Sequence, residues 1–422
     1  MKKSAALFST VILSILICSC IGEMDTQKIL DIVKNTYPID TVDTRHEWNL
    51  LQTTTRLFVT ADIDEQVSRI QILSDDPYSS TTAEILAEKF AQRDERVSMS
   101  FELPITKAAN TCYAAAVSRS GKYYVVPIGN STEVNFSSGN VVSQGTLNAP
   151  AYQTFTYLFE EDYPLPGDFD YNDVVLRISK EIPSANILKI KVTLAAVGSQ
   201  SQIGAAIRIS NIPYTSVEEV TIDEGVRFDA DYPYDRYYID KKSLWVKGRD
   251  GSTVINLFDD AHWSLNPKSS NGTITRMYYN VSKTEKEDVY STVNEKTLTY
   301  SIRMKDDNDV SYFMLSDLDP FIIVNNNGLN TEVHTYVNKY TEAIWHYTTG
   351  KSSKEDHVAW ALLIPDASFH YPIEGNPIGR YRNGEIYGAY SRYNHSFGQW
   401  GRNCQSSLDW WHYDYATKAQ VY

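Results

Sequence analysis

Apolar side chains that recur at every second position constrain the fold of this chain more than any other feature. In "RLFVTADI", Leu57, Val59 and Ala61 alternate with more polar neighbours. "SRIQILSDDP" and "RVSMSFELP" repeat this spacing, and "CYAAAVSRSGKYYVVPI" is typical of a hairpin that turns near Gly121. Successive side chains of a strand point to opposite faces, so the pattern predicts half-buried antiparallel strands. We therefore expect residues 48–142 to form a small β-sandwich.

A polar stretch, "NSTEVNFSSGNVVSQGTLNAP", then predicts a domain boundary. Strand-like runs resume beyond it, among them "YQTFTYLF", "DVVLRIS", "ILKIKVTLAAVG" and "PFIIV". The predicted fold class is therefore mainly β, with 143–422 forming a larger antiparallel domain, sandwich- or jelly-roll-like, that has few short helices. Two segments leave alternatives. "TTAEILAEKF" fits a helix or a bulged strand, and the aromatic-rich C-terminal part is consistent with a short helix that packs back on the sheet.

The N-terminus predicts export. Lys2 and Lys3 precede an apolar segment that is too short to span a membrane, which is the pattern of a signal peptide. The following "LICSCIGE" resembles a bacterial lipobox, in which Cys20 is lipidated and becomes the first residue of the mature chain. We expect residues 1–19 to be a lipoprotein signal peptide, and the membrane to be a partner through the lipid anchor.

Residues 20–47 predict a tether followed by a short helix. "KILDIVKN" places Ile29, Leu30 and Val33 on one face at helical spacing, and Pro38 ends the pattern.

The charge of the chain argues against one class of partner, and its cysteines leave the question of a disulfide open. The chain has 39 basic and 53 acidic residues, a formal net charge of −14, so it has no electrostatic reason to bind nucleic acid. Cys112 and Cys404 could pair in an oxidising compartment, or they could serve as small buried side chains.

The stretch "FEEDYPLPGDFDYND", residues 159–173, contains six acidic residues and no Lys or Arg. Carboxylates held close together raise one another's pKa, and a bound divalent cation relieves their repulsion. Ca²⁺ accepts six to eight oxygens from carboxylates, amides and carbonyls, and no nearby Cys or His suggests zinc. The alternative is a solvated turn whose Asx side chains bond to their own backbone.

Alternation within this stretch would separate its acidic from its aromatic residues. In a strand, Asp168, Asp170 and Asn172 would share one face, while Phe169 and Tyr171 would point into a core from the other. The predicted metal ligands are Asp168, Asp170, Asn172 and Asp173, with Glu160 and Glu161 in support.

The segment "FEEDYPLPGDFDYNDVVLRIS" resembles the signature of the LruC-type domain, a domain of unknown function in exported bacterial proteins. The resemblance continues in "LFDDAHW", "TEVHTYV" and "HVAWALLIPDASFHYPIEG" and covers about 150–422; Glu161 departs from the more usual Asp. It implies a calcium-like acidic motif and no reaction. The N-terminal part resembles lipoproteins of Bacteroides-type bacteria, which implies an outer-membrane lipoprotein of the cell envelope, potentially exposed at the surface.

Enzymatic signatures are sparse in the sequence. There is no HExxH or Gly-x-Ser-x-Gly motif. Asp317 and Asp319 stand at alternate positions and could pair as a glycosidase requires, while His334 and His357 lie in strand-like contexts typical of structural histidines. The leading hypothesis is therefore a non-catalytic protein of the envelope, with hydrolysis a minor alternative.

Aromatic content supports a second alternative, a carbohydrate-binding or adhesin module with a glycan or surface protein as partner. The chain has 30 Tyr and 8 Trp residues, and Trp400, Trp410 and Trp411 lie close together in sequence. Such rings either stack on sugars or fill β-sandwich cores.

Overall fold

The computed structural model describes the chain from residue 26 onward, with gaps. The described residues are 26–137, 139–163, 167–230, 243–265, 280–281, 295–305, 310–326, 329–335 and 358–422. The expected signal peptide and Cys20 lie outside them. Within these ranges, no helix combines the length and the hydropathy that crossing a membrane requires.

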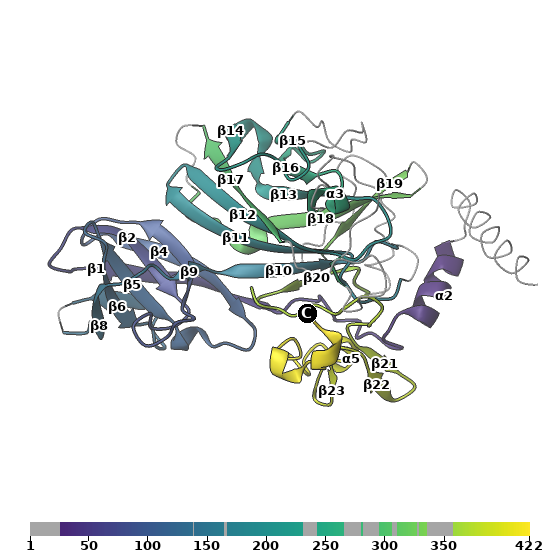
Figure 1. Ribbon diagram of the computed structural model, residues 1–422. Coiled ribbons are helices and arrows are strands. Elements are labelled where there is room, and N and C mark those ends of the chain that lie inside the picture. Colours follow the sequence, from purple (N-terminus) through teal and green to yellow (C-terminus); the bar gives the residue numbers. More distant parts are fainter. Residues whose placement is uncertain are drawn as a thin grey trace, which may run out of the picture.

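The first unit is a β-sandwich with its own core (Figure 1). One sheet has the order β4-β1-β7 and the other β8-β6-β5-β2-β3-β9. Their bounds are β1 Leu51–Ala61, β2 Val67–Leu73, β3 Glu84–Phe90, β4 Arg96–Pro104, β5 Tyr113–Ser118, β6 Lys122–Pro127, β7 Glu133–Phe136, β8 Ser143–Thr146 and β9 Ala151–Tyr152. The predicted sandwich is confirmed.

Local details of this unit resolve several alternatives. Residues 84–90 form a strand, with a bulge in its pairing to β2, and not a helix. Gly121, with a φ of 81°, makes the predicted turn between β5 and β6.

The expected domain boundary at residue 142 lies too early, because β8 and β9 extend the second sheet of this sandwich. Cys112 and Cys404 are both free thiols, so the disulfide alternative is wrong.

The second unit is a larger sandwich of two antiparallel sheets, ordered β14-β17-β12-β11-β10-β20 and β15-β16-β13-β18-β19. Its elements are β10 Thr154–Phe159, β11 Val174–Ser184, β12 Ile187–Val197, β13 Ile203–Pro213, β14 Val217–Ile222, β15 Trp245–Lys247, β16 Ser252–Phe258, α3 Ala261–Leu265, β17 Lys296–Met304, β18 Leu318–Asn326, β19 Leu329–His334 and β20 Ala361–Ile364. The mainly β fold class is thus confirmed.

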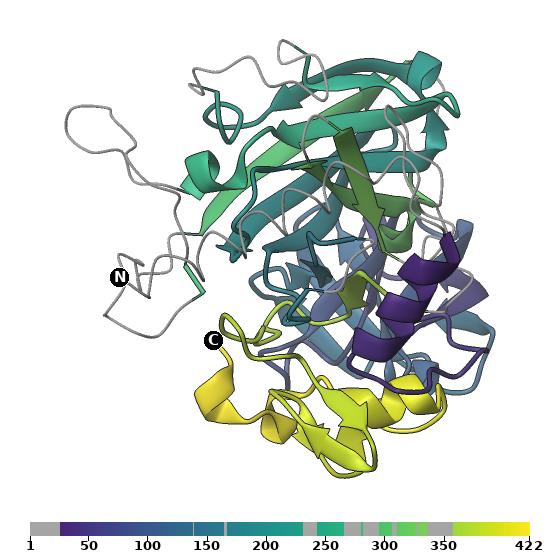
Figure 2. The ribbon, with the colours of Figure 1, turned by 90° about the vertical axis from the view of Figure 1, so that its right-hand side faces the viewer.

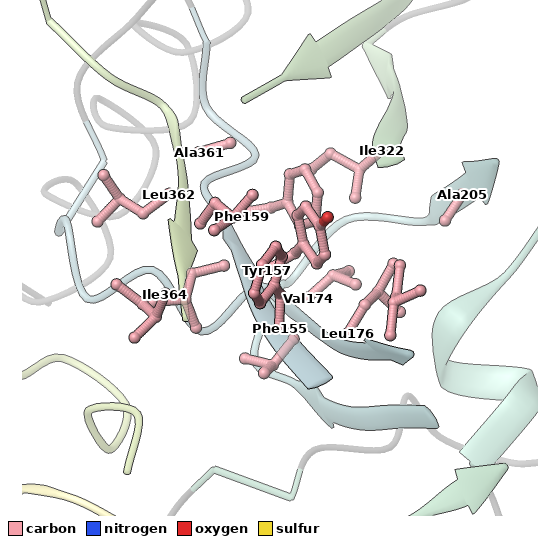
Figure 3. Packing of buried hydrophobic residues seen from close by; sticks show 14 of the residues in the cluster. Phe155, Tyr157, Phe159, Val174, Leu176, Ala205, Ile322, Ala361, Leu362 and Ile364 are labelled. Carbon is pink, nitrogen blue, oxygen red and sulfur yellow. The ribbon is translucent and has the colours of Figure 1, made fainter. Parts of the chain in front are cut away.

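Aromatic side chains of β10 fill the space between these sheets (Figure 3). Phe155, Tyr157 and Phe159 are fully buried beside residues of the neighbouring strands β11 and β20. Ala205 and Ile322 face them from the opposite sheet. Strand β10, which is second from the edge of its sheet, therefore contributes three rings to the core, and the acidic stretch begins directly after its last residue, Phe159.

The C-terminal segment, residues 365–422, packs beneath the large sandwich (Figure 1). It contains β21 Arg380–Arg382, β22 Glu385–Tyr387, β23 Ser391–Arg392, β24 His395–Ser396 and the predicted short helix, α5 Phe397–Arg402. Trp400, Trp410 and Trp411 are 1%, 0% and 6% exposed. These rings fill the core, so the expectation that they could present faces to a sugar is wrong.

The N-terminal strap, which we define as residues 26–50, also belongs to this core (Figure 2). It begins with α2 Thr26–Thr36 and continues through Tyr37 and Trp48, each 1% exposed. Trp48 packs edge-on against Trp400 at a centroid distance of 5.3 Å, and the His46 ring bonds to the carbonyl of Trp400. The predicted short helix is thus confirmed as α2. The residues that follow it are not a free tether, because Tyr37 and His46 are buried and the His46 ring bonds to a residue 354 positions further along the chain.

Replacing Trp48 tests this assignment. Trp48→Ala removes a buried ring and should lower the free energy of unfolding by about 3–5 kcal/mol, measured by urea denaturation. The matched control is Tyr393→Ala in the C-terminal segment, whose ring is 73% exposed and whose loss should cost less than about 0.5 kcal/mol. Equal, small effects of both substitutions would mean that the strap is a loosely held tether.

Candidate metal site

The acidic stretch connects two neighbouring strands at one end of the large sandwich. Phe159 of β10 pairs with Val174 of β11, so residues 160–173 form the connection between them. Residues 164–166 lie outside the described part. The expectation that 168–172 form a strand is wrong: the segment has no regular structure, and Phe169 and Tyr171 both have a φ of 58°.

Two buried aromatic side chains hold this loop in place. Phe169 is 1% exposed and packs edge-on against Tyr37 of the strap at 5.1 Å. Tyr171 is fully buried, and its hydroxyl donates to the carbonyl of Ala359 at 2.7 Å. A positive φ is costly for a bulky side chain, so this packing must stabilise both residues. The aromatic side chains are in the core as predicted, but the expectation that the polar residues lie outside it is wrong for Asp170 and Asn172, which are 1% and 0% exposed.

Three carboxylates meet beside these rings. One oxygen each from Glu160, Asp168 and Asp170 lies within 4.8 Å of the others. Glu160 and Asp170 are each 1% exposed, whereas Asp168 is exposed. Oxygen ligands bind Ca²⁺ at about 2.3–2.6 Å, so two ligands of one ion can stand up to about 5 Å apart. The three carboxylates are close enough to share one cation, and we call them the three-carboxylate group.

Backbone amides orient the two buried members. The N–H of Tyr171 donates to Glu160 Oε1 at 2.5 Å. Asp170 accepts from the N–H of Asn172 at 3.0 Å and from that of Gly375 at 2.9 Å. A carboxylate oxygen has a second lone pair, so these bonds leave it able to bind a cation.

Gly167 leaves room for the group. A Cβ at this position would lie 2.7 Å from Glu160 Oε2 and 2.9 Å from Asp162 Oδ2. Glycine is thus required here by space, because any side chain would displace the carboxylates.

Burial and mutual repulsion favour the neutral forms of these acids. Burial first, and then neighbouring carboxylates, raise the pKa of Glu160, Asp170 and Asp173 well above their usual values. The same causes raise the pKa of Asp162 to about 6 and that of Glu374 to about 7. In the described part of the chain, no Lys or Arg forms an ion pair with any of the five. A cation would make their ionised forms favourable.

The other three predicted ligands are not in the three-carboxylate group. Glu161 accepts from the N–H of Ser201 at 3.2 Å, and Asp173 accepts from the N–H of Glu161 at 2.6 Å. Asn172 donates through Nδ2 to the carbonyl of Pro372, and its buried Oδ1 has no partner among the described residues. These side chains fix the loop to its surroundings.

Glu374 is the acid that sequence reasoning missed. It lies in the C-terminal segment, where Ile378 donates to the carbonyl of Phe169 at 2.8 Å and so joins that segment to the loop. Asp168 and Glu161 both act on the pKa of Glu374. No local pattern in "YPIEG" reveals this proximity, because some 200 residues separate it from the loop.

The other predicted carboxylate pair is engaged elsewhere. Asp317 ends a short 3-10 helix, Leu315–Asp317, and caps its start by accepting from the N–H of Met314 at 2.8 Å. Asp319 is buried between Arg208 Nε at 3.0 Å and His334 Nδ1 at 2.9 Å. His334 is thus a structural histidine in an ionic network; His357 lies outside the described residues.

The titration of His334 gives a pH-dependent prediction. Burial alone would lower its pKa, but Asp319 and Glu332 raise it to about 9. The folded pKa exceeds the unfolded value near 6.5, so this group's contribution is complete below about pH 6.5 and is lost as the pH rises through 9.

Accordingly, the difference in unfolding free energy between the unsubstituted chain and His334→Gln should shrink between pH 7 and pH 10, by about 3 kcal/mol at most. Chemical denaturation across this range measures it, with the exposed His412→Gln as control. A difference that stays constant with pH would contradict the assignment.

Comparison with known proteins assigns the chain to a protein family. The model described as Domain of unknown function (DUF4842) matches residues 186–411, more than half of the chain. This match begins after the loop, so the three-carboxylate group lies outside it. No curated protein matches the chain. A crystal structure of a candidate lipoprotein from Bacteroides ovatus is similar at 13% identity and a TM-score of 0.40, over 84% of this chain and 99% of that one.

Proposed function

We propose a function for this chain, which belongs to the family of the domain of unknown function DUF4842, from the chemistry of its own site. The protein is a non-catalytic, lipid-anchored component of the cell envelope. Its three-carboxylate group binds Ca²⁺ and thereby stiffens the large sandwich. The LruC-type designation and the outer-membrane location are part of this proposal.

The observation that carries the calcium proposal is the convergence of Glu160, Asp168 and Asp170 oxygens within 4.8 Å at a largely buried position. A solvated turn, the alternative, would expose its carboxylates to water, yet two of these three are 1% exposed. An all-oxygen set of this kind suits a hard cation, and its irregular geometry suits Ca²⁺ better than Mg²⁺.

Calcium at this position would connect three distant parts of the chain. The loop contributes the carboxylates, and Gly375 of the C-terminal segment donates to one of them. Tyr171 places its hydroxyl beside that of Tyr37 in the strap, at 3.4 Å. The ion would therefore favour the docked arrangement of all three segments, which is a structural role.

A calcium titration with paired variants tests this role. In the unsubstituted chain, Ca²⁺ at about 100 times its dissociation constant should raise the melting temperature by about 5 °C or more, because ligand binding at that level stabilises the fold by about 2.7 kcal/mol. Asp168→Asn should abolish the rise. Asp168 is exposed, so its substitution should leave the calcium-free melting temperature nearly unchanged.

Asp64→Asn, an equally conservative change at an exposed position of the first sandwich, is the matched control and should retain the full rise. Titration calorimetry gives the stoichiometry, expected to be one ion bound through this group. The proposal fails if Ca²⁺ produces neither heat nor stabilisation, or if Asp168→Asn responds like Asp64→Asn.

The anchor rests on the lipobox-like sequence around Cys20 and is tested separately. Metabolic labelling with palmitate in a bacterial host should mark the unsubstituted chain and not Cys20→Ala. Cys18→Ala, two positions away, should still be labelled. Labelling that depends on Cys18, or that neither substitution removes, would overturn the assignment.

A further inference from the structure

A cleft lies between the two sandwiches, and none of the residues of the three-carboxylate group lines it. It has a volume of about 690 Å³, within the range of about 300–1,000 Å³ that small-molecule sites occupy. Pro77 and residues 80–84 and 148–151 of the first sandwich line it, and so do residues 365–368, which follow β20 of the second. Interfaces between domains are preferred places for such sites.

The lining favours a ligand rich in hydrogen-bond donors. Glu84 and Asp366 contribute carboxylates from opposite sandwiches, and Ser80, Asn148 and Ser368 add hydroxyl and amide groups. The described lining residues include no Lys or Arg that could attract an anion. They also include no aromatic ring on which a sugar would stack, since their apolar members are Pro and Ala.

Glu84 has the less satisfied carboxyl of the two. Burial first, and then Asp366, raise its pKa to about 7; Lys107 opposes this change and Asp75 adds to it. Lys107 is itself paired with Asp75 at 2.8 Å, which limits what it offers to Glu84. Among the described residues, none donates a hydrogen bond to the Glu84 carboxyl.

Asp366 is fixed in position by its own contacts. Its Oδ1 accepts from the N–H of Ser368 at 2.7 Å, and its main-chain carbonyl accepts from Thr156 Oγ1 at 2.6 Å. Thr156 belongs to β10 of the large sandwich. These contacts fix the Asp366 carboxylate in the same cleft that Glu84 lines from the first sandwich.

We propose that this cleft binds a protonated organic amine, whose N–H groups donate to Glu84 on one sandwich and to Asp366 on the other. The ligand joins the two sandwiches through charge-assisted hydrogen bonds. This site is independent of the calcium site, and it can hold even if the calcium proposal fails.

Calorimetric titration of the full-length chain with spermidine tests the proposal. The buffer contains 150 mM salt, which screens attraction to the acidic surface beyond about 8 Å, and saturating Ca²⁺. We expect saturable binding with one ligand per chain. Glu84→Gln keeps the shape of the side chain and removes its charge, so it should weaken binding about tenfold, and Asp366→Asn should act similarly.

The matched control is Glu385→Gln, the same substitution at an exposed position outside the cleft, which should bind like the unsubstituted chain. Affinity should rise from pH 6 to pH 8 as Glu84 ionises, and Glu84→Gln should lack this dependence. Melting temperatures confirm that each variant is folded; if one is not, the other carries the test.

Two results would overturn the proposal. One is that spermidine shows no saturable binding, or that Glu84→Gln and Asp366→Asn bind it as tightly as Glu385→Gln does. Equal affinities of the three variants would mean that spermidine is attracted nonspecifically to an acidic chain. The other is saturable binding of a neutral sugar, tested with maltotriose, that competes with spermidine and is insensitive to the charge of Glu84.

Discussion

Burial of like-charged carboxyls beside two aromatic side chains is the constraint on which this structure depends. Phe169 and Tyr171 occupy the core with a positive φ, and Asp168 and Asp170 alternate with them in sequence. With the rings buried, oxygens of Asp168 and Asp170 lie within 4.8 Å of a Glu160 oxygen. Hydrophobic packing therefore holds the carboxyls close together, which is unfavourable when they are ionised and no cation is bound.

Segments from both ends of the chain converge on this loop. Tyr37 of the strap packs on Phe169, and the C-terminal segment donates from Gly375 to Asp170. Both contacts come from segments that lie outside the two sheets of the large sandwich. A cation that neutralises the carboxyls would consequently stabilise the docking of both the strap and the C-terminal segment. We infer that this long-range stabilisation is the function of burying carboxyls of like charge.

Much of the fold follows from local pattern, whereas the site follows only in part. Period-two alternation predicts both sandwiches, and it predicts that Phe169 and Tyr171 are buried but not that Asp170 is buried with them. The positive φ of Phe169 was not predictable, because it is stabilised by rings from distant residues. Proximity of Glu374 and burial of Trp48 were missed for the same reason: both depend on contacts across more than 200 residues.

The central claim is that one cation is shared by the three-carboxylate group. Anomalous scattering from crystals grown with Ca²⁺ tests it most directly. Our account predicts a calcium peak bonded to oxygens of Glu160, Asp168 and Asp170 at about 2.3–2.6 Å. The claim would be contradicted if these carboxylates were well ordered but had no anomalous peak between them. The crystal would have to contain Ca²⁺ at a concentration that fills other sites.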